Sequence, residues 1–369
     1  MAGELPERNQ SHEIAWPMPV LFEIFIIACG AIMKGLFIPG VTELGASSDS
    51  FPSGIVIPGA NVITLPPGEW VDLSDIDLTS SALDYRVSFS CASNHAYYSA
   101  DGTIQFAAPD VWPLEYRNGV AVGRHEPEPQ DTNLLIWSSS FNAWTKAGIT
   151  VTQNAAPDIS GGNTAQMLTA SATSYSRVFV SPQLSAGNNT LTLIVRAGST
   201  PYLHGTFEDI GITNTMRFYA NMTTLETSVV VVRGIISGEM TARKFVGGWV
   251  MLTLHAVLPA DSGYYVFFGP SNVLGGVSAM VGDTIYAAFT QLERGPVATS
   301  LIATNGAAAT RAAAFAWVKN PGLMAAAARI YYTDGTTHDI ALNGAERGSI
   351  PQSTKDWGKR YIQRIEYIR

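Results

Sequence analysis

The feature that most constrains the fold of this chain is a regular series of short strand-like runs between residues 131 and 302. Each run is rich in β-branched and aromatic residues, and turn-forming residues separate it from the next. The runs are AGITVTQN, TAQMLTASA, SRVFVSP, NTLTLIVRAG, MRFYANM, TSVVVVRGII, GGWVMLTLHAVLP, GYYVFFGP and DTIYAAFTQLERG. Strands of this number and spacing predict an all-β fold, with a two-sheet antiparallel β-sandwich over residues 131–303.

The sequence on either side of the predicted sandwich is also rich in strand and turn signals. Residues 54–130 contain a hairpin signal at Asp101-Gly102 and end in a Pro/Glu-rich linker, so they predict a small β-rich connector. Residues 304–369 begin alanine-rich and contain a second hairpin signal at Asp334-Gly335. We expect them to form a small C-terminal β-rich domain.

Residues 1–53 contain an apolar run, VLFEIFIIACGAIMKGLFI, at positions 20–38. As a helix this run would be about 28 Å long, close to the thickness of a bilayer's hydrocarbon core. Glu23 and Lys34 lie inside the run, and glycines interrupt it. We therefore favour an N-terminal anchoring arm buried between subunits or against a larger assembly over a membrane span, which remains the alternative.

The composition excludes several classes of function. Hydrophobic residues make up 46% of the chain and charged residues 14%, which is too apolar for a disordered protein. The net charge is −8 without a basic run, so no nucleic-acid partner is expected. The two cysteines, Cys29 and Cys91, are too few for a disulfide scaffold and indicate buried free thiols in a protein made in a reducing cytoplasm.

No motif for catalysis is found. The six histidines show no metal-ligand spacing, and no G-x-S-x-G sequence occurs. Glu208 and Asp209 are adjacent and would point to opposite faces of a strand, whereas a glycosidase needs two carboxylates across one sugar. The expectation is a protein that is not an enzyme.

Three sequence blocks carry a resemblance to a known group. The blocks are VSFSCASNHAYYSADGTIQFAAPDVWPLEY, EPQDTNLLIWSSSFNAWTKAGITVT and LERGPVATSLIATNGAAATRAA, and together they span roughly residues 85–312. In this order they resemble bacteriophage virion proteins: tail-fibre, tail-tip and head-fibre subunits whose central domain is a jelly roll similar to a carbohydrate-binding module. The apolar arm is not part of the shared pattern, and Cys91 stands where such sequences often carry arginine.

The resemblance implies a structural protein of the virion, assembled in the host cytoplasm. The expected role is a tail fibre, spike or tail-tip subunit that forms a homotrimer, contacts other virion proteins and attaches to a host surface polysaccharide. A purely architectural neck, collar or head-decoration subunit, and a polysaccharide-degrading spike, are the alternatives. The best-matched residues look structural: Asn133, Phe141 and Trp144 where the sandwich begins, and Thr310 and Arg311 just after its last strand.

The resemblance also directs attention to residues 199–211, STPYLHGTFEDIG. Aromatic faces beside planar polar groups are what sugar recognition needs. The candidate glycan-binding residues are Tyr202, His204, Phe207, Glu208 and Asp209, with Tyr202 and His204 on the same face of one strand. Further candidates are Trp137, Tyr175, Tyr219, Tyr264 and Tyr265; the alternative for any of these aromatic residues is a core or subunit contact.

No cofactor is required, but jelly rolls of this kind can bind Ca²⁺ through aspartates and carbonyls. Asp158 with Asn163, or Asp283, could contribute to such a site. No compact calcium loop is present in the sequence.

Overall fold

The computed structural model describes residues 23–28, 31–36 and 71–369, which belong to two compact units, residues 1–69 and 70–369. In the first unit, β1 (Glu23–Ala28) and β2 (Ala31–Leu36) pair antiparallel, with Glu23 opposite Leu36 and Ala28 opposite Ala31. These strands differ from the single helix through residues 20–38 that the membrane-span alternative required, because a run rich in Ile and Phe suits a strand as well as a helix. The expected anchoring role of this segment stays a prediction. In the described residues, no helix is long and apolar enough to cross a membrane.

The second unit is built around two antiparallel sheets. The seven-stranded sheet has the order β10 (Thr145–Ala147), β13 (Arg177–Val180), β21 (Ser262–Ser271), β16 (Tyr202–Asp209), β17 (Thr215–Asn221) and β18 (Thr227–Arg233), with β14 (Gln183–Leu184) also on β21. The six-stranded sheet has the order β11 (Ile149–Ala156), β12 (Ala165–Ala170), β22 (Thr284–Arg294), β15 (Gly187–Ala197), β20 (Trp249–Leu258) and β19 (Ser237–Lys244).

These two sheets form a sandwich because their strands alternate in the side chains that face inward. In β20, Val250, Leu252 and Leu254 enter the core between the sheets, where they meet residues of the other sheet such as Leu203 and Phe268. The predicted all-β class and the antiparallel sandwich of the jelly-roll type are confirmed. All nine predicted runs contain strands; in the two sheets, β10, β14, β16 and β19 are additional.

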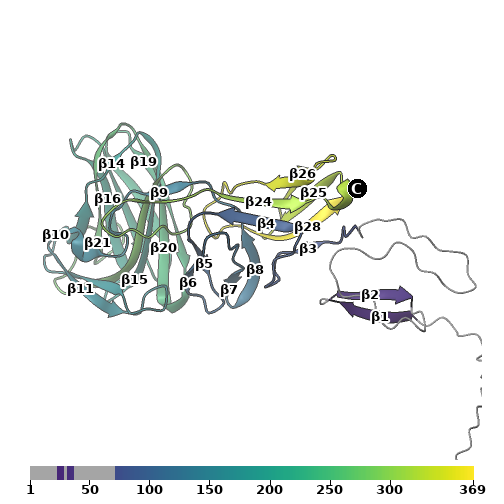
Figure 1. The fold of residues 1–369 in the computed structure, drawn as a ribbon. Coiled ribbons are helices and arrows are strands. Elements are labelled where there is room, and N and C mark those ends of the chain that lie inside the picture. The colour runs from purple at the N-terminus through teal and green to yellow at the C-terminus, as the bar shows by residue number, and fades with distance from the viewer. Residues whose placement is uncertain (1–22, 29–30, 37–70) are drawn as a thin grey trace, which may run out of the picture. The chain divides into compact units, whose positions relative to one another are not determined.

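The strands before and after the sandwich pair with one another (Figure 1). One sheet has the order β27 (Arg347–Ile350), β24 (Ala314–Lys319) and β4 (Val87–Cys91); another has the order β26 (Thr337–Ala341), β25 (Ala327–Tyr332), β28 (Tyr361–Ile368), β8 (Val120–His125) and β7 (Glu115–Arg117), with β3 (Ile76–Asp77) on β28. The segments 54–130 and 304–369, which the sequence separated, thus share two sheets. Pairing between strands so far apart in the sequence leaves no local signal. The predicted domain boundaries at residues 130 and 303 stay predictions.

The remaining elements are short. Two strand pairs are β9 (Asp131–Asn133) with β23 (Ala309–Arg311), and β5 (His95–Tyr98) with β6 (Ile104–Ala107). The 3₁₀ turns are η1 (Phe141–Ala143), η2 (Val246–Gly248) and η3 (Pro321–Leu323). Phe141 and Trp144 lie in the sandwich core and contact Phe268, so their predicted role at the end of the sandwich is confirmed.

The two outer faces of the sandwich have different surroundings. Outward side chains of the six-stranded sheet, such as Ile194 and Trp249, pack in a second core with Tyr98, Trp357 and Tyr361 from the flanking segments. In the described part of the chain, no such core covers the outward side of the seven-stranded sheet. A surface for a ligand is therefore to be sought there first.

Candidate ligand-binding face of the sandwich

Strand β16 carries all five predicted glycan-binding residues and lies between β21 and β17, inside the seven-stranded sheet. Because side chains alternate along a strand, Tyr202, His204 and Glu208 share the outward side, as the sequence predicted for Tyr202 and His204. Leu203 and Phe207 point inward and lie in the sandwich core. Phe207 is fully buried and cannot contact a ligand on this face, so the alternative of a core role applies to it.

Glu208 and Asp209 point in different directions, as predicted, and neither is part of a carboxylate pair across a cleft. Glu208 accepts a hydrogen bond from the hydroxyl of Thr215 (3.0 Å). Asp209 holds the turn after β16: it accepts hydrogen bonds from the backbone N–H of Thr213 (2.6 Å) and from the amide of Asn214 (2.8 Å). These bonds give Asp209 a structural role in the turn and lower the pKa of its carboxyl, although burial alone would raise it.

His204 lies at the centre of the outward side. Its ring is fully buried and packs edge-to-face against Tyr175 (6.2 Å between centroids) and Phe267 (6.4 Å). The Nε2–H donates to the carbonyl oxygen of Ser176 (3.2 Å), which leaves Nδ1 as an acceptor without a partner. Burial, together with the nearby charges of Arg177 and Arg217, lowers the pKa of His204 to about 4.

The two arginines named above stack on aromatic rings of the same face. The Arg177 guanidinium lies over the rings of Phe267 (4.9 Å to the centroid), Tyr175 (5.5 Å) and Phe179 (5.8 Å). The Arg217 guanidinium lies 5.4 Å from the centroid of Tyr175 and donates to its hydroxyl. The pairing register places Arg217 opposite Thr206 of β16.

We call this surface the open face. It consists of Tyr202, His204, Thr206 and Glu208 of β16, Arg217 and Tyr219 of β17, Tyr265 and Phe267 of β21, Arg177 and Phe179 of β13, and Tyr175 from the preceding loop. Tyr219 lies opposite His204 and Tyr265 opposite Glu208. Of the other aromatic candidates, Tyr264 is in the core and Trp137 packs half-buried against it.

Two positions explain how the loop before β13 reaches this face. A Cβ atom on Gly269 would come within 1.9 Å of the Ser176 carbonyl oxygen, so only glycine lets the loop lie against β21. Tyr175 has a positive φ of 51°, a strained conformation for a tyrosine, and its N–H donates to Val277 (3.1 Å). The sequence offered no signal for this loop, which is why Arg177, Phe179, Arg217 and Phe267 were not predicted.

Several buried polar atoms of the open face have no partner within the described residues: His204 Nδ1, Thr206 Oγ1, and the Nε atoms of Arg177 and Arg217. Most buried polar groups in proteins are hydrogen-bonded, and exceptions call for a water, an ion or a ligand. The arrangement offers aromatic faces, donors and one acceptor, and no nucleophile with an adjacent base. Such an arrangement is suited to binding a ligand.

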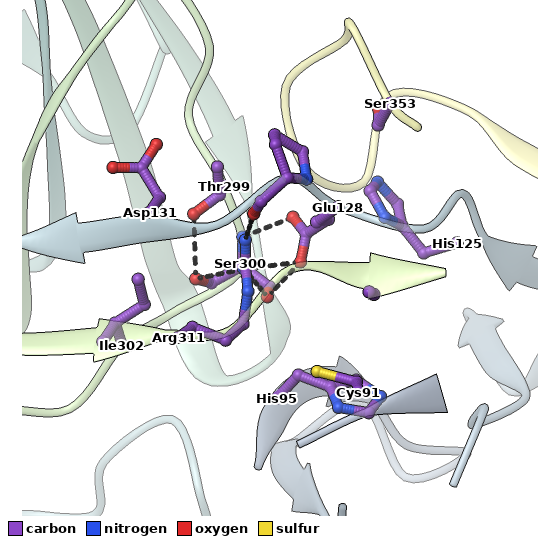
Figure 2. Close-up of polar contacts among 12 residues, drawn as sticks. Cys91, His95, His125, Glu128, Asp131, Thr299, Ser300, Ile302, Arg311 and Ser353 are labelled. Carbon is purple, nitrogen blue, oxygen red and sulfur yellow. Dashed lines mark hydrogen bonds and ion pairs between the residues drawn. The ribbon is translucent and has the colours of Figure 1, made fainter. Parts of the chain in front are cut away.

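A second polar cluster lies where the sandwich meets the flanking sheets (Figure 2). Arg311 Nη1 contacts Glu128 Oε2 (2.6 Å), which also accepts from the hydroxyl of Ser300 (2.5 Å). The adjoining cavity, lined by Cys91, His95 and His125 among others, has a volume of about 20 Å³. That is room for about one water molecule. We assign this cluster a structural role.

Cys91 is buried as a free thiol, as predicted, while Cys29 lies outside the described residues. The described residues contain no group of three His, Cys, Asp or Glu side chains placed to hold a metal ion. Asp158 accepts from the backbone N–H of Ser160 (2.8 Å) and Asp283 from that of Met280 (2.7 Å), while Asn163 donates to the Asn154 carbonyl (3.2 Å). Calcium binding by backbone carbonyls at these positions stays a prediction.

An open groove of about 770 Å³ runs beside β19 and β20. In it, His255 lies between the hydroxyl of Thr190 (3.1 Å) and Asp356 (3.2 Å), the order of groups found in some hydrolases. Thr190 is fully buried, however, and its hydroxyl donates to the Gly295 carbonyl (2.8 Å). No Trp, Tyr or Phe side chain lines the groove, so it suits a sugar less well than the open face does.

The titration of His204 gives a first testable expectation. Its pKa is lower in the folded than in the unfolded protein, so its contribution to stability is present above pH 6.5 and is lost as the pH falls toward 4. The loss amounts to about 3 kcal/mol. An NMR titration of the His204 ring should give a midpoint near pH 4, and a midpoint near 6.5 would show that the ring is not buried as described.

Comparisons with known proteins add little information about the ligand of this face. No protein-family model matches the chain. No curated protein matches it in sequence. Among solved structures, the CBM22-1 xylan-binding domain of Xyn10C from Paenibacillus barcinonensis is 14% identical, with a TM-score of 0.28 over 45% of this chain and 96% of that domain. The CBM22-1–GH10 modules of the Clostridium thermocellum xylanase 10B, complexed with xylohexaose, are 14% identical, with a TM-score of 0.26 over 49% of this chain and 30% of that one. Both similarities are too weak to assign a ligand to this chain.

Proposed function

We propose that this chain is a non-enzymatic glycan-binding protein whose open face contacts a polysaccharide. The observation that carries the proposal is the cluster of Tyr175, His204 and Phe267 with two stacked arginines, on a side of the sheet where no second core packs in the described residues. Sugars bind proteins by placing C–H groups on aromatic rings and hydroxyls on planar polar groups. The open face offers both within one sheet.

The finer part of the proposal is that the glycan lies on a bacterial host and that this chain is a subunit of a phage particle. That part is supported by the three sequence blocks that resemble virion proteins, and the same resemblance supports a homotrimer with virion partners. The apolar run at 20–38 is then the segment that attaches the protein to the particle.

Affinity electrophoresis of the full chain against a panel of neutral and acidic polysaccharides tests the binding function. We expect at least one polysaccharide to retard the parent protein and Tyr175→Ala to weaken that binding about tenfold, because one lost stacking contact is worth about 1–1.5 kcal/mol.

The matched control is Tyr331→Ala. Tyr331 also lies beneath an arginine, Arg364 at 3.9 Å, but on β25 of a different sheet. Its replacement should leave binding unchanged. Equal losses for both variants would point to a general effect on folding, and the absence of retardation by every polysaccharide would refute the proposed function.

A further inference from the structure

Resting on the proposed function, we propose that the open face is specific for an acidic polysaccharide, one whose sugars carry carboxylate groups. The argument starts from Arg177 and Arg217. Both are half-buried on the open face, and in the described part of the chain neither lies within ion-pair distance of a carboxylate. Other arginines also have no ion pair among the described residues, but these two stack on the same ring, that of Tyr175.

The hydrogen bonds of the two guanidiniums leave most of their donors free. Arg177 donates from Nη1 to the carbonyl of Tyr175 (2.9 Å), and Arg217 donates from Nη2 to the Tyr175 hydroxyl. A guanidinium has five N–H donors in a planar fork, so a ligand can still be bound by each. The fork matches the two oxygens of a carboxylate, and pairs of this kind are among the strongest hydrogen-bonded contacts in proteins.

The surroundings hold the two arginines in position. Arg177 stacks on Phe267 and Phe179, and Tyr175 contacts both arginines. Tyr175 belongs to the strained loop that can approach β21 only because residue 269 is a glycine. Fixed, stacked guanidiniums lose less conformational entropy on binding than free ones do. Guanidiniums beside aromatic rings suit a chain of acidic sugars. The guanidiniums can bind its carboxylates and the rings can contact the C–H faces of its sugars.

The charges on the outward side of the sheet favour an anion. The single carboxylate on the β16 part of the open face, Glu208, is opposite Tyr265 and already accepts from Thr215. His204 is neutral and its ring is fully buried beneath the face, so it adds no negative charge there. The face is thus locally positive within a protein of net charge −8.

The test compares polymers that share a backbone but differ in charge. Calorimetric titrations of the full chain would use polygalacturonate, alginate and hyaluronan, each with its methyl-esterified form, and one neutral polymer with its sulfated derivative. We expect at least one carboxylated polymer to bind at least tenfold more tightly than its own methyl ester. The same binding should weaken several-fold between 50 and 300 mM NaCl, because salt screens the contacts.

Variants then assign the binding to the two arginines. Arg177→Gln and Arg217→Gln should each weaken binding at least tenfold, and the lysine replacements should restore only part of it, since lysine keeps the charge without the fork. Arg329→Gln, which removes an exposed arginine of β25 paired with Asp339, should have no effect. Thermal unfolding of each variant checks that it is folded.

The outcomes separate this inference from the function on which it rests. Tighter or equal binding of the methyl esters, or of a neutral polymer, overturns the preference for carboxylates and keeps the glycan-binding function. Preference for the sulfated polymer alone likewise overturns it. Binding that survives both glutamine replacements in folded protein removes the open face as the site, and no binding by any polymer removes the function as well.

Discussion

Replacing Arg311 with methionine is expected to lower the free energy of unfolding by about 3–5 kcal/mol, the cost of leaving one partner of a buried ion pair uncompensated. Arg311 and Glu128 are both buried, and their side chains meet at 2.6 Å. Arg311 also donates to the carbonyl of Pro129 (2.7 Å), and the Ser300 N–H donates to Glu128 (2.7 Å). Although burial would raise the pKa of the Glu128 carboxyl, Arg311 and the Ser300 bonds lower it, so the carboxylate is charged and needs its partner.

Chemical denaturation monitored by tryptophan fluorescence measures the change. The matched control is Arg329→Met, since Arg329 pairs with Asp339 at 2.7 Å on the exposed surface. That variant should lose less than about 1 kcal/mol. Adding Glu128→Gln to Arg311→Met should recover part of the loss, because the isolated charge is then gone. A loss below about 1 kcal/mol for Arg311→Met would mean that the pair is open to water.

Replacing Trp144 with alanine is expected to cost about 3–5 kcal/mol for a different reason, the cavity that a large core side chain leaves behind. The Trp144 ring is 2% exposed, contacts Phe141 and Phe268, and donates from Nε1 to the Trp137 carbonyl (3.1 Å). Thermal and denaturant unfolding measure the effect. Phe106→Ala, at a ring that is 45% exposed, is the control and should cost about 0.5 kcal/mol or less.

These two expectations concern residues whose structural role the sequence already indicated. Asn133 is buried, and its amide donates to the carbonyls of Thr290 (3.2 Å) and Ile302 (2.9 Å), which ties the start of the sandwich to its last strand. Phe141, Trp144 and Arg311 likewise hold the sandwich together. The local sequence was informative here because aromatic residues and the alternation of side chains along a strand can be recognised within a short stretch.

The parts that the sequence did not predict depend on contacts between distant residues. The pairing of β4 with β24 joins residues 87–91 to 314–318, and the cover over the six-stranded sheet joins Trp357 to Tyr98. For the site, alternation correctly placed Tyr202 and His204 on one side of a strand. It could not tell which side of the sheet has no second core packed on it, and it could not show that Arg177 and Arg217 lie beside these residues.

The strand pair β9–β23 has a consequence for how such a protein can diversify. It places Asn133 opposite Ala309, so the segment between them, which contains the sandwich, begins and ends at neighbouring points. Segments whose ends lie close together are the ones best tolerated as insertions. Recombination at these two points could exchange the whole segment between Asn133 and Ala309 while the flanking sheets keep their own pairing.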